Sequence, residues 1–200
     1  SFENIKLDIL EINEDDKNNN LDNVKNEDLD LENLSFKIID FGSAEAEGKM
    51  DHDEILARSY RPPENILNSY YDRKADIWVI GCMLYEFFNG CSLFNLKDCD
   101  LQGVDKDRRH IAEMYDVLGK MPKEMAMVCE FSEDIFDNKG RVIKNKGIEE
   151  RDIKKELCYR FNIEDIELDK IHKLIFKILN YNPKLRPSCS DILKNEWFEG

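Results

Sequence analysis

The chain has 200 residues, 42% of them hydrophobic, so it can bury one sizeable core, and its formal charge is -14. Residues 1–34 carry eleven acids against three lysines, which leaves -6 for the other 166 residues. This mildly acidic surface argues against direct nucleic-acid binding and suits a basic protein partner. No apolar run reaches the roughly 18 residues that cross a bilayer, and no signal-peptide pattern opens the chain. We therefore expect a protein without membrane contact, cytoplasmic and/or nuclear.

The first 39 residues contain two strand-like segments separated by a polar stretch. Asn4 to Ile12 alternates in hydropathy, and Phe36 to Ile39 is short and β-rich, so the two are predicted to form a short two-stranded hairpin. Residues 13–35 between them are acidic, rich in Asn and poor in large apolar side chains. Such a composition cannot offset the entropy of ordering, so we predict a disordered insert here.

Helical patterns dominate from Ala75 onward. A nearly continuous apolar run extends to Phe88 and ends at Asn89-Gly90, a typical helix stop, so this helix should be the buried axis of the domain. Further helices are predicted from Asp107 to Leu118, from Leu168 to Leu179, and from Cys189 to Asn195 behind a Ser188 cap. Two strands followed by four or five helices predict an α+β fold, mainly helical, with one domain over residues 36–200.

Four short motifs occur in a fixed order along this domain. Asp40-Phe41-Gly42 follows the second predicted strand, and Pro62-Pro63-Glu64 comes about twenty residues later. The segment Asp76 to Gly81 reads D-x-W-x-x-G, and Arg186 lies within the late segment N-P-K-L-R-P-S. Alone, the D-F-G tripeptide is equally a turn after a strand, with Gly supplying an unusual backbone angle. In this order and spacing, the four motifs resemble the C-terminal lobe of a protein kinase.

The resemblance implies a phosphoryl-transfer site that uses ATP and Mg²⁺. Asp40 would hold Mg²⁺ against the nucleotide phosphates. Glu3-Asn4-Ile5 resembles the end of the family's H-x-D-x-K-P-E-N-I-L catalytic loop, which would make Asn4 the second metal ligand, although a chance match in an Asn-rich segment is the alternative. In this register residues 1–12 are the end of the catalytic loop and the following strand. The catalytic aspartate is then expected just upstream of Ser1, the N-terminal lobe is absent, and this chain alone is expected to be inactive.

Three residues take structural roles in the same family. Glu64 and Arg186 would form a buried ion pair between the end of the activation segment, residues 40–64, and the late part of the lobe. Asp76 would accept hydrogen bonds from backbone amides of the catalytic loop. These three roles are architectural rather than catalytic.

The segment Ala57 to Glu64, A-R-S-Y-R-P-P-E, resembles the T-R-x-Y-R-x-P-E signature of the CMGC group of kinases. It places Gly42, Ala57, Arg58 and Arg61 in the activation segment and substrate pocket. Ala57 occupies the position where serine/threonine kinases usually have threonine. The only hydroxyl residues from Ser43 to Arg61 are Ser43, Ser59 and Tyr60, so a phosphorylation switch is not expected.

Two later segments decide the expected subfamily. Residues 109–119 and 131–140 look like the G helix and the adjoining insert of the SR protein kinases, for which a long spacer before D-F-G is also characteristic. The resemblance implies a basic, Arg-Ser-rich protein substrate. Acids that could dock it are Asp105, Asp107, Glu113 and Asp116, although each could equally belong to a solvated helix face. Arg109 departs from the subfamily, which tends to be acidic there.

The sequence thus predicts a serine/threonine protein kinase C-lobe, acting as a monomer within a larger chain. A catalytically dead docking module is one alternative, favoured by Ala57 and by Ser1 at the position of the catalytic-loop lysine. A LAMMER-type kinase is the other, favoured by Asp40-Phe41-Gly42-Ser43-Ala44. Upstream sequence would separate them, because an intact catalytic loop and Gly-rich loop would exclude the docking module.

Overall fold

A computed structural model describes residues 37–39, 41–44, 56–96, 101–127, 129–143, 149–160 and 165–198. The chain divides into two compact units, Ser1–Ala44 and Glu45–Gly200.

The described part of the first unit is short. Residues 37–39 carry no strand assignment, and a 3₁₀ turn, η6, covers Phe41–Ser43 and is closed by a hydrogen bond from the Ala44 amide to the Phe41 carbonyl, 3.0 Å. The predicted strand Asn4 to Ile12, the insert at residues 13–35 and Asp40 lie outside the described residues. The two-stranded hairpin therefore stays a prediction.

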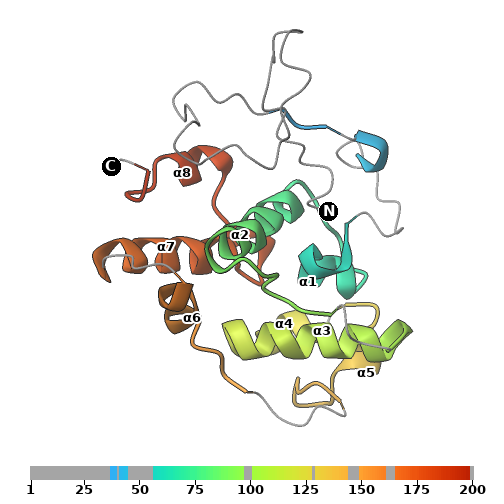
Figure 1. Ribbon diagram of the computed structural model, residues 1–200. Helices are drawn as coiled ribbons and strands as arrows, with labels where there is room; N and C mark the ends of the chain where they lie inside the picture. Colours follow the sequence, from blue (N-terminus) through green and yellow to red (C-terminus); the bar gives the residue numbers. More distant parts are fainter. Residues whose placement is uncertain are drawn as a thin grey trace, which may run out of the picture. The chain divides into compact units, whose positions relative to one another are not determined.

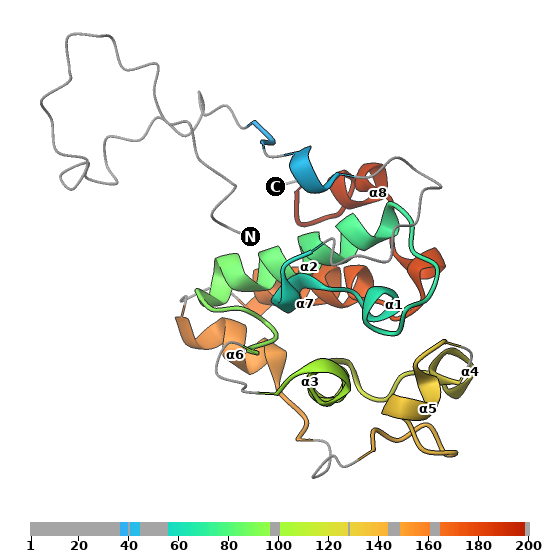
Figure 2. The ribbon, with the colours of Figure 1, turned by 90° about the vertical axis from the view of Figure 1, so that its right-hand side faces the viewer.

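Helix α2, Lys74–Asn89, is the central element of the second unit (Figure 1). It packs against α7 and α6, and Figure 2 shows α7 running alongside it. The helix ends where the sequence predicts, because Gly90 adopts a left-handed conformation, φ 69°, and its amide donates to the Glu86 carbonyl at 2.7 Å. Trp78 is fully buried, which confirms α2 as the axis of the core.

The remaining described elements of this unit are helices and 3₁₀ turns, of which α3 and α7 are long. In chain order they are η7 Arg58–Tyr60, α1 Pro63–Ile66, α3 Gly103–Leu118, α4 Lys123–Ala126, α5 Ser132–Ile135, α6 Ile153–Arg160, α7 Asp165–Ile178, η8 Pro183–Leu185 and α8 Cys189–Leu193. Pairing of β type in the described ranges is limited to one isolated antiparallel bridge, between Phe136 and Val142. The described part of the chain is therefore helical.

The predicted helices exist, with shifted ends. Helix α3 begins at Gly103, four residues before the predicted start, and stops at Gly119, φ 75°, as predicted. Helix α8 begins behind Ser188, whose side chain forms a reciprocal capping box with Asp191, but it ends at Leu193 rather than at Asn195. Helix α7 covers nearly the predicted range. None of the described helices is long and apolar enough to span a membrane.

Gly81 lets α2 approach the end of α7 closely. A Cβ atom at this position would lie 2.7 Å from Ile178 Cγ2 and from Leu179 Cδ2. Both neighbours are buried, with exposed fractions of 0% and 2%. The glycine of the D-x-W-x-x-G motif is thus a packing requirement of the core.

Candidate functional site

A buried ion pair joins α1 to the segment around η8. Arg186 donates to both carboxylate oxygens of Glu64, Nη1 to Oε1 at 2.6 Å and Nη2 to Oε2 at 2.7 Å, and the side chains are 0% and 5% exposed. Arg186 Nε and Nη1 also donate to the carbonyls of Asn180, 2.8 Å, and Lys74, 2.9 Å, and the guanidinium lies 5.0 Å from the Trp78 ring centroid. The geometry brings together the two residues that the sequence paired across 122 positions.

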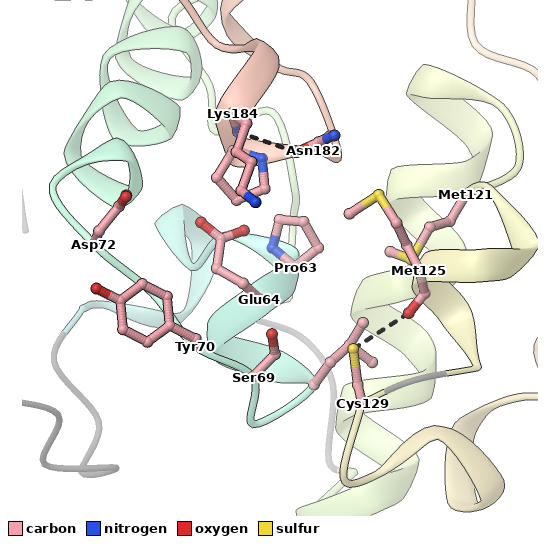
Figure 3. A pocket seen from close by; sticks show the side chains of 12 residues that line it. Pro63, Glu64, Ser69, Tyr70, Asp72, Met121, Met125, Cys129, Asn182 and Lys184 are labelled. Carbon is pink, nitrogen blue, oxygen red and sulfur yellow. Dashed lines mark hydrogen bonds between the residues drawn. The ribbon is translucent and has the colours of Figure 1, made fainter.

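A pocket of about 290 Å³ lies beside this ion pair (Figure 3). Pro63 and Glu64 line one side, and Met121, Met125 and Cys129 bring sulfur atoms to the other. The Cys129 thiol donates to the Met125 carbonyl at 3.3 Å, and burial raises the pKa of Cys129. Sequence reasoning singled out two wall segments, P-P-E and N-P-K-L-R-P-S, but missed the pocket because Met121, Met125 and Cys129 complete it from a segment without a motif.

The end of the activation segment is fastened to α3 and α2 by side chains. Arg58 Nη2 lies 2.5 Å from Asp107 Oδ1, and the Tyr60 hydroxyl donates to Glu86 Oε2 at 2.5 Å. Arg61 is buried, and its Nε donates to the Leu56 carbonyl at 2.9 Å. The predicted substrate-pocket residues Arg58 and Arg61 therefore lie on a short segment held by two helices, whereas Ala57 is exposed.

His110 is buried beneath this segment. Its ring centroid lies 5.3 Å from that of Phe94, and both imidazole nitrogens, like Arg58 Nε, lack a hydrogen-bond partner among the described residues. Burial lowers the pKa of His110 well below 6.5, and the positive charges of Arg58 and Arg61 lower it further. The imidazole is thus neutral at physiological pH. Sequence reasoning assigned no role to His110, because a histidine on a helix carries no signal of burial.

Asp76 lies in the first turn of α2 and is exposed. Its carboxylate is nevertheless partly desolvated, which raises its pKa. No hydrogen bond to its side chain is found within the described ranges. The catalytic-loop amides that the sequence predicts as its partners lie outside those ranges, so this role stays a prediction.

All four predicted docking acids lie on α3, and each already has a partner. Glu113 is the most enclosed, with a side chain 10% exposed, and Arg109 Nε donates to it at 3.0 Å. Burial raises the pKa of Glu113, although Arg109 opposes the shift. The pairs are Asp105 with Arg108, Asp107 with Arg58, Glu113 with Arg109, and Asp116 Oδ1 with the backbone amide of Glu149 at 2.9 Å. Three of the four acids are thus paired with an arginine, and Asp116 alone keeps its charge without a cationic partner among the described residues.

A second pocket, about 640 Å³, lies where α2 meets the segment before α6. Arg151 forms two hydrogen bonds with Glu156, at 3.0 and 2.6 Å, and its backbone amide donates to the Asp116 carbonyl at 2.8 Å. Glu150 and Asp152 also line the pocket and are exposed. Lys155 lines the pocket too and is exposed, so the rim carries both signs of charge. This rim adjoins Asp116 of α3, a neighbourhood that the sequence did not predict.

The predicted magnesium ligands Asp40 and Asn4 lie outside the described residues. Gly42 is described and is exposed in η6. The described residues contain no group of three or more His, Cys, Asp or Glu side chains that could hold a metal ion. The metal site therefore stays a prediction from the sequence.

Comparison with known proteins identifies the family. The model of the protein kinase domain matches residues 15–198, so the chain belongs to the protein kinase domain family.

Relatives of two kinds are similar to the chain. Dual specificity protein kinase CLK1 of Homo sapiens is 29% identical over 185 residues, covering 88% of this chain and 35% of the relative. Serine/threonine-protein kinase SRPK of Physarum polycephalum is 34% identical over 165 residues, covering 80% and 38%. Probable serine/threonine-protein kinase sky1 of Dictyostelium discoideum is 30% identical over 181 residues, covering 88% and 27%. The chain spans about a third of these relatives' length, and the subfamily is not resolved.

Proposed function

We propose that the chain is the C-terminal part of a kinase catalytic domain that transfers the γ-phosphoryl of ATP to serines of Arg-Ser-rich proteins. The observation that supports this most is the Glu64–Arg186 pair, because it fixes the end of the activation segment to the core at 2.6 and 2.7 Å. The same segment carries Arg58, which pairs with Asp107 of α3, and Tyr60, which donates to Glu86 of α2, and we expect the substrate pocket beside them. The similarity to an SRPK and to sky1 agrees with serine as the acceptor.

In this proposal Asp40 and Asn4 would hold Mg²⁺, which would supply positive charge to the ATP phosphates. The rest of the chain positions the substrate. Helix α2, Lys74–Asn89, would serve as the base of the site, and the Arg58–Tyr60 turn would border the bound peptide. Phosphoryl transfer depends on such positioning. It also requires the catalytic aspartate, which the family resemblance predicts upstream of Ser1.

Two exposed carboxylates support the proposed substrate class. Glu150 and Asp152 are exposed on the rim of the larger pocket, and Asp116 adjoins it. Exposed carboxylates attract guanidinium groups, which can bind them through two parallel hydrogen bonds. An Arg-rich segment is therefore the partner that this surface fits, and the attraction should weaken as salt rises.

A docking module without phosphoryl transfer is the second candidate. Ala57 favours it, because alanine cannot supply the hydroxyl that serine/threonine kinases use next to the catalytic aspartate. A LAMMER-type kinase is a third reading of the same family, since dual specificity kinases also match the chain. A dual specificity enzyme would phosphorylate tyrosine as well as serine.

The test is phosphate transfer by the gene product extended at its N-terminus through the catalytic loop and the ATP-binding lobe. We expect transfer from Mg²⁺-ATP to an Arg-Ser peptide and none with Asp40→Ala. A peptide with Lys in place of each Arg is the control for charge alone, and one with Tyr in place of Ser distinguishes dual specificity. Binding of the Arg-Ser peptide without transfer would establish the docking module instead.

A further inference from the structure

The Arg58–Asp107 contact links two residues that the sequence placed in different functional groups. Arg58 belongs to the predicted substrate pocket, and Asp107 was grouped by charge with the docking acids. Their atoms Nη2 and Oδ1 are 2.5 Å apart, and the side chains are only 19% and 18% exposed. By contrast, the Asp105 side chain on the same helix is 54% exposed. Asp107 is therefore directed to the activation segment rather than to solvent.

Asp107 is the carboxylate that pairs with Arg58 in the part of the chain that the structure describes. Among the described residues, its guanidinium forms no other ion pair, and its buried Nε has no hydrogen-bond partner. The neighbouring His110 supplies no negative charge, because it is neutral and fully buried. Asp107 is consequently the group that compensates the partly desolvated charge of Arg58.

We infer that Asp107 is a positioning residue whose carboxylate holds Arg58, and with it the Arg58–Tyr60 turn, against α3 without any phosphorylated side chain. The inference rests on the proposed function for its catalytic consequence, since it assigns the turn to the substrate pocket. The turn itself is closed by amides of Tyr60 and Arg61, which donate to the carbonyls of Ala57 at 3.0 Å and Arg58 at 3.2 Å. Tyr60 adds a second contact, to Glu86 on α2. Removing Asp107 leaves that second contact in place, so the expected effect is local loosening.

Hydrogen exchange on the 200-residue chain measures this loosening directly. Asp107→Ala should raise exchange at the amides of Tyr60 and Arg61 by on the order of tenfold and leave α2 unchanged. Asp107→Glu should restore most of the protection, because it returns the charge. Asp105→Ala is the matched control, with the same charge removed from the same helix, and should leave both amides as in the wild type.

Equal exchange at Tyr60 and Arg61 in the wild type and Asp107→Ala, or an equal rise in Asp105→Ala, would overturn the inference. Arg58→Gln provides a second test should Asp107→Ala unfold the chain, which loss of protection throughout α2 would reveal. Arg58→Gln should raise exchange at the amides of Tyr60 and Arg61. Exchange at the wild-type rate at both amides would also overturn the inference.

Kinetics of the extended gene product test the catalytic consequence. Asp107→Ala should lower kcat/KM for the Arg-Ser peptide by on the order of tenfold with the KM for ATP unchanged. Absence of transfer by the wild type would contradict the proposed function, whereas the exchange experiment would still decide whether Asp107 holds the turn.

Discussion

The ion pairs around Arg186 and around α3 use the same kinds of side chain in opposite environments. Arg186 is 0% exposed and binds both oxygens of a carboxylate that is 5% exposed. Arg109 of α3 is 54% exposed and reaches its carboxylate through a single nitrogen. A buried charge cannot lose its partner without remaining desolvated, whereas an exposed charge is rescued by water. The first pair therefore fixes the fold, and the second leaves a surface on which a partner can compete.

One part of the second unit therefore stabilises the fold, and another part carries the surface that a partner would bind. Helix α2, Glu64 and Arg186 form the rigid base. Helix α3 and the pocket rim carry charges that are open to solvent, among them Arg109, 54% exposed, and Glu150, which is also exposed. Substitutions at the buried pair should therefore change stability most, and substitutions on α3 should change it least.

Removing one partner of the buried pair should have the largest effect. Glu64→Gln should lower the free energy of unfolding by about 3–5 kcal/mol, because Arg186 would remain buried without a carboxylate. Urea denaturation measures it. Glu133→Gln, at an exposed position of α5, is the control and should change stability by less than about 0.5 kcal/mol. Similar losses in the two variants would remove the distinction between the two environments.

Overpacking the core beneath the pair should come next. Gly81→Val should cost about 3 kcal/mol, near the upper end for inserted core atoms, because the first added carbon already meets Ile178 and Leu179 at 2.7 Å. Ser190→Val, on the exposed face of α8, is the matched control for valine in a helix. A wild-type melting temperature for Gly81→Val would contradict the close helix packing.

The buried His110 predicts a pH dependence that the exposed surface should not share. Its pKa lies well below the ordinary 6.5, so below pH 6.5 the unfolded chain takes up a proton that the folded chain excludes. The free energy of unfolding should therefore fall with falling pH, by up to about 1.4 kcal/mol per pH unit, and stay constant above pH 6.5 for this group. His110→Gln should flatten the slope. Replacing His172, which is only half-buried, should flatten it less.

The Arg109–Glu113 pair of α3, in which only the arginine is exposed, should give the smallest effect, and on binding rather than on stability. Arg109→Ala should tighten binding of an Arg-Ser peptide two- to fivefold, because a pair with a solvent-exposed partner contributes about 0.2–1 kcal/mol and the variant leaves Glu113 for the peptide. Fluorescence anisotropy measures it. Arg108→Ala removes the same charge from the same helix, and equal tightening there would show a general charge effect instead of competition for Glu113.

The sequence predicted the parts of this account that depend on local chemistry. The run from Ala75 to Gly90 defined α2, and Ser188 defined the start of α8. The pairing of Glu64 with Arg186 was predicted through the family resemblance. Helix α6 was missed because only Ile153 and Leu157, one turn apart, face its buried side in the part described.

Long-range partners set the limit of sequence reasoning. Arg108 and Arg109 lie three and four residues from the acids they bind, so their pairing is readable from helical spacing. Arg58 and Asp107 are 49 positions apart and share no motif, so only the folded chain shows that Asp107 faces the activation segment. Burial of His110 is equally invisible in a helix that also carries seven charged residues.

Thermal melting of the 200-residue chain with Mg²⁺-ATP or with an Arg-Ser peptide, alongside a phosphate-transfer assay, tests the central claim most directly. A ligand that binds only the folded state raises the midpoint. We expect the Arg-Ser peptide to raise the melting temperature at low salt and Mg²⁺-ATP to leave it unchanged. We also expect this chain alone to phosphorylate no serine. A shift with Mg²⁺-ATP together with serine phosphorylation would contradict the division between docking and phosphoryl transfer.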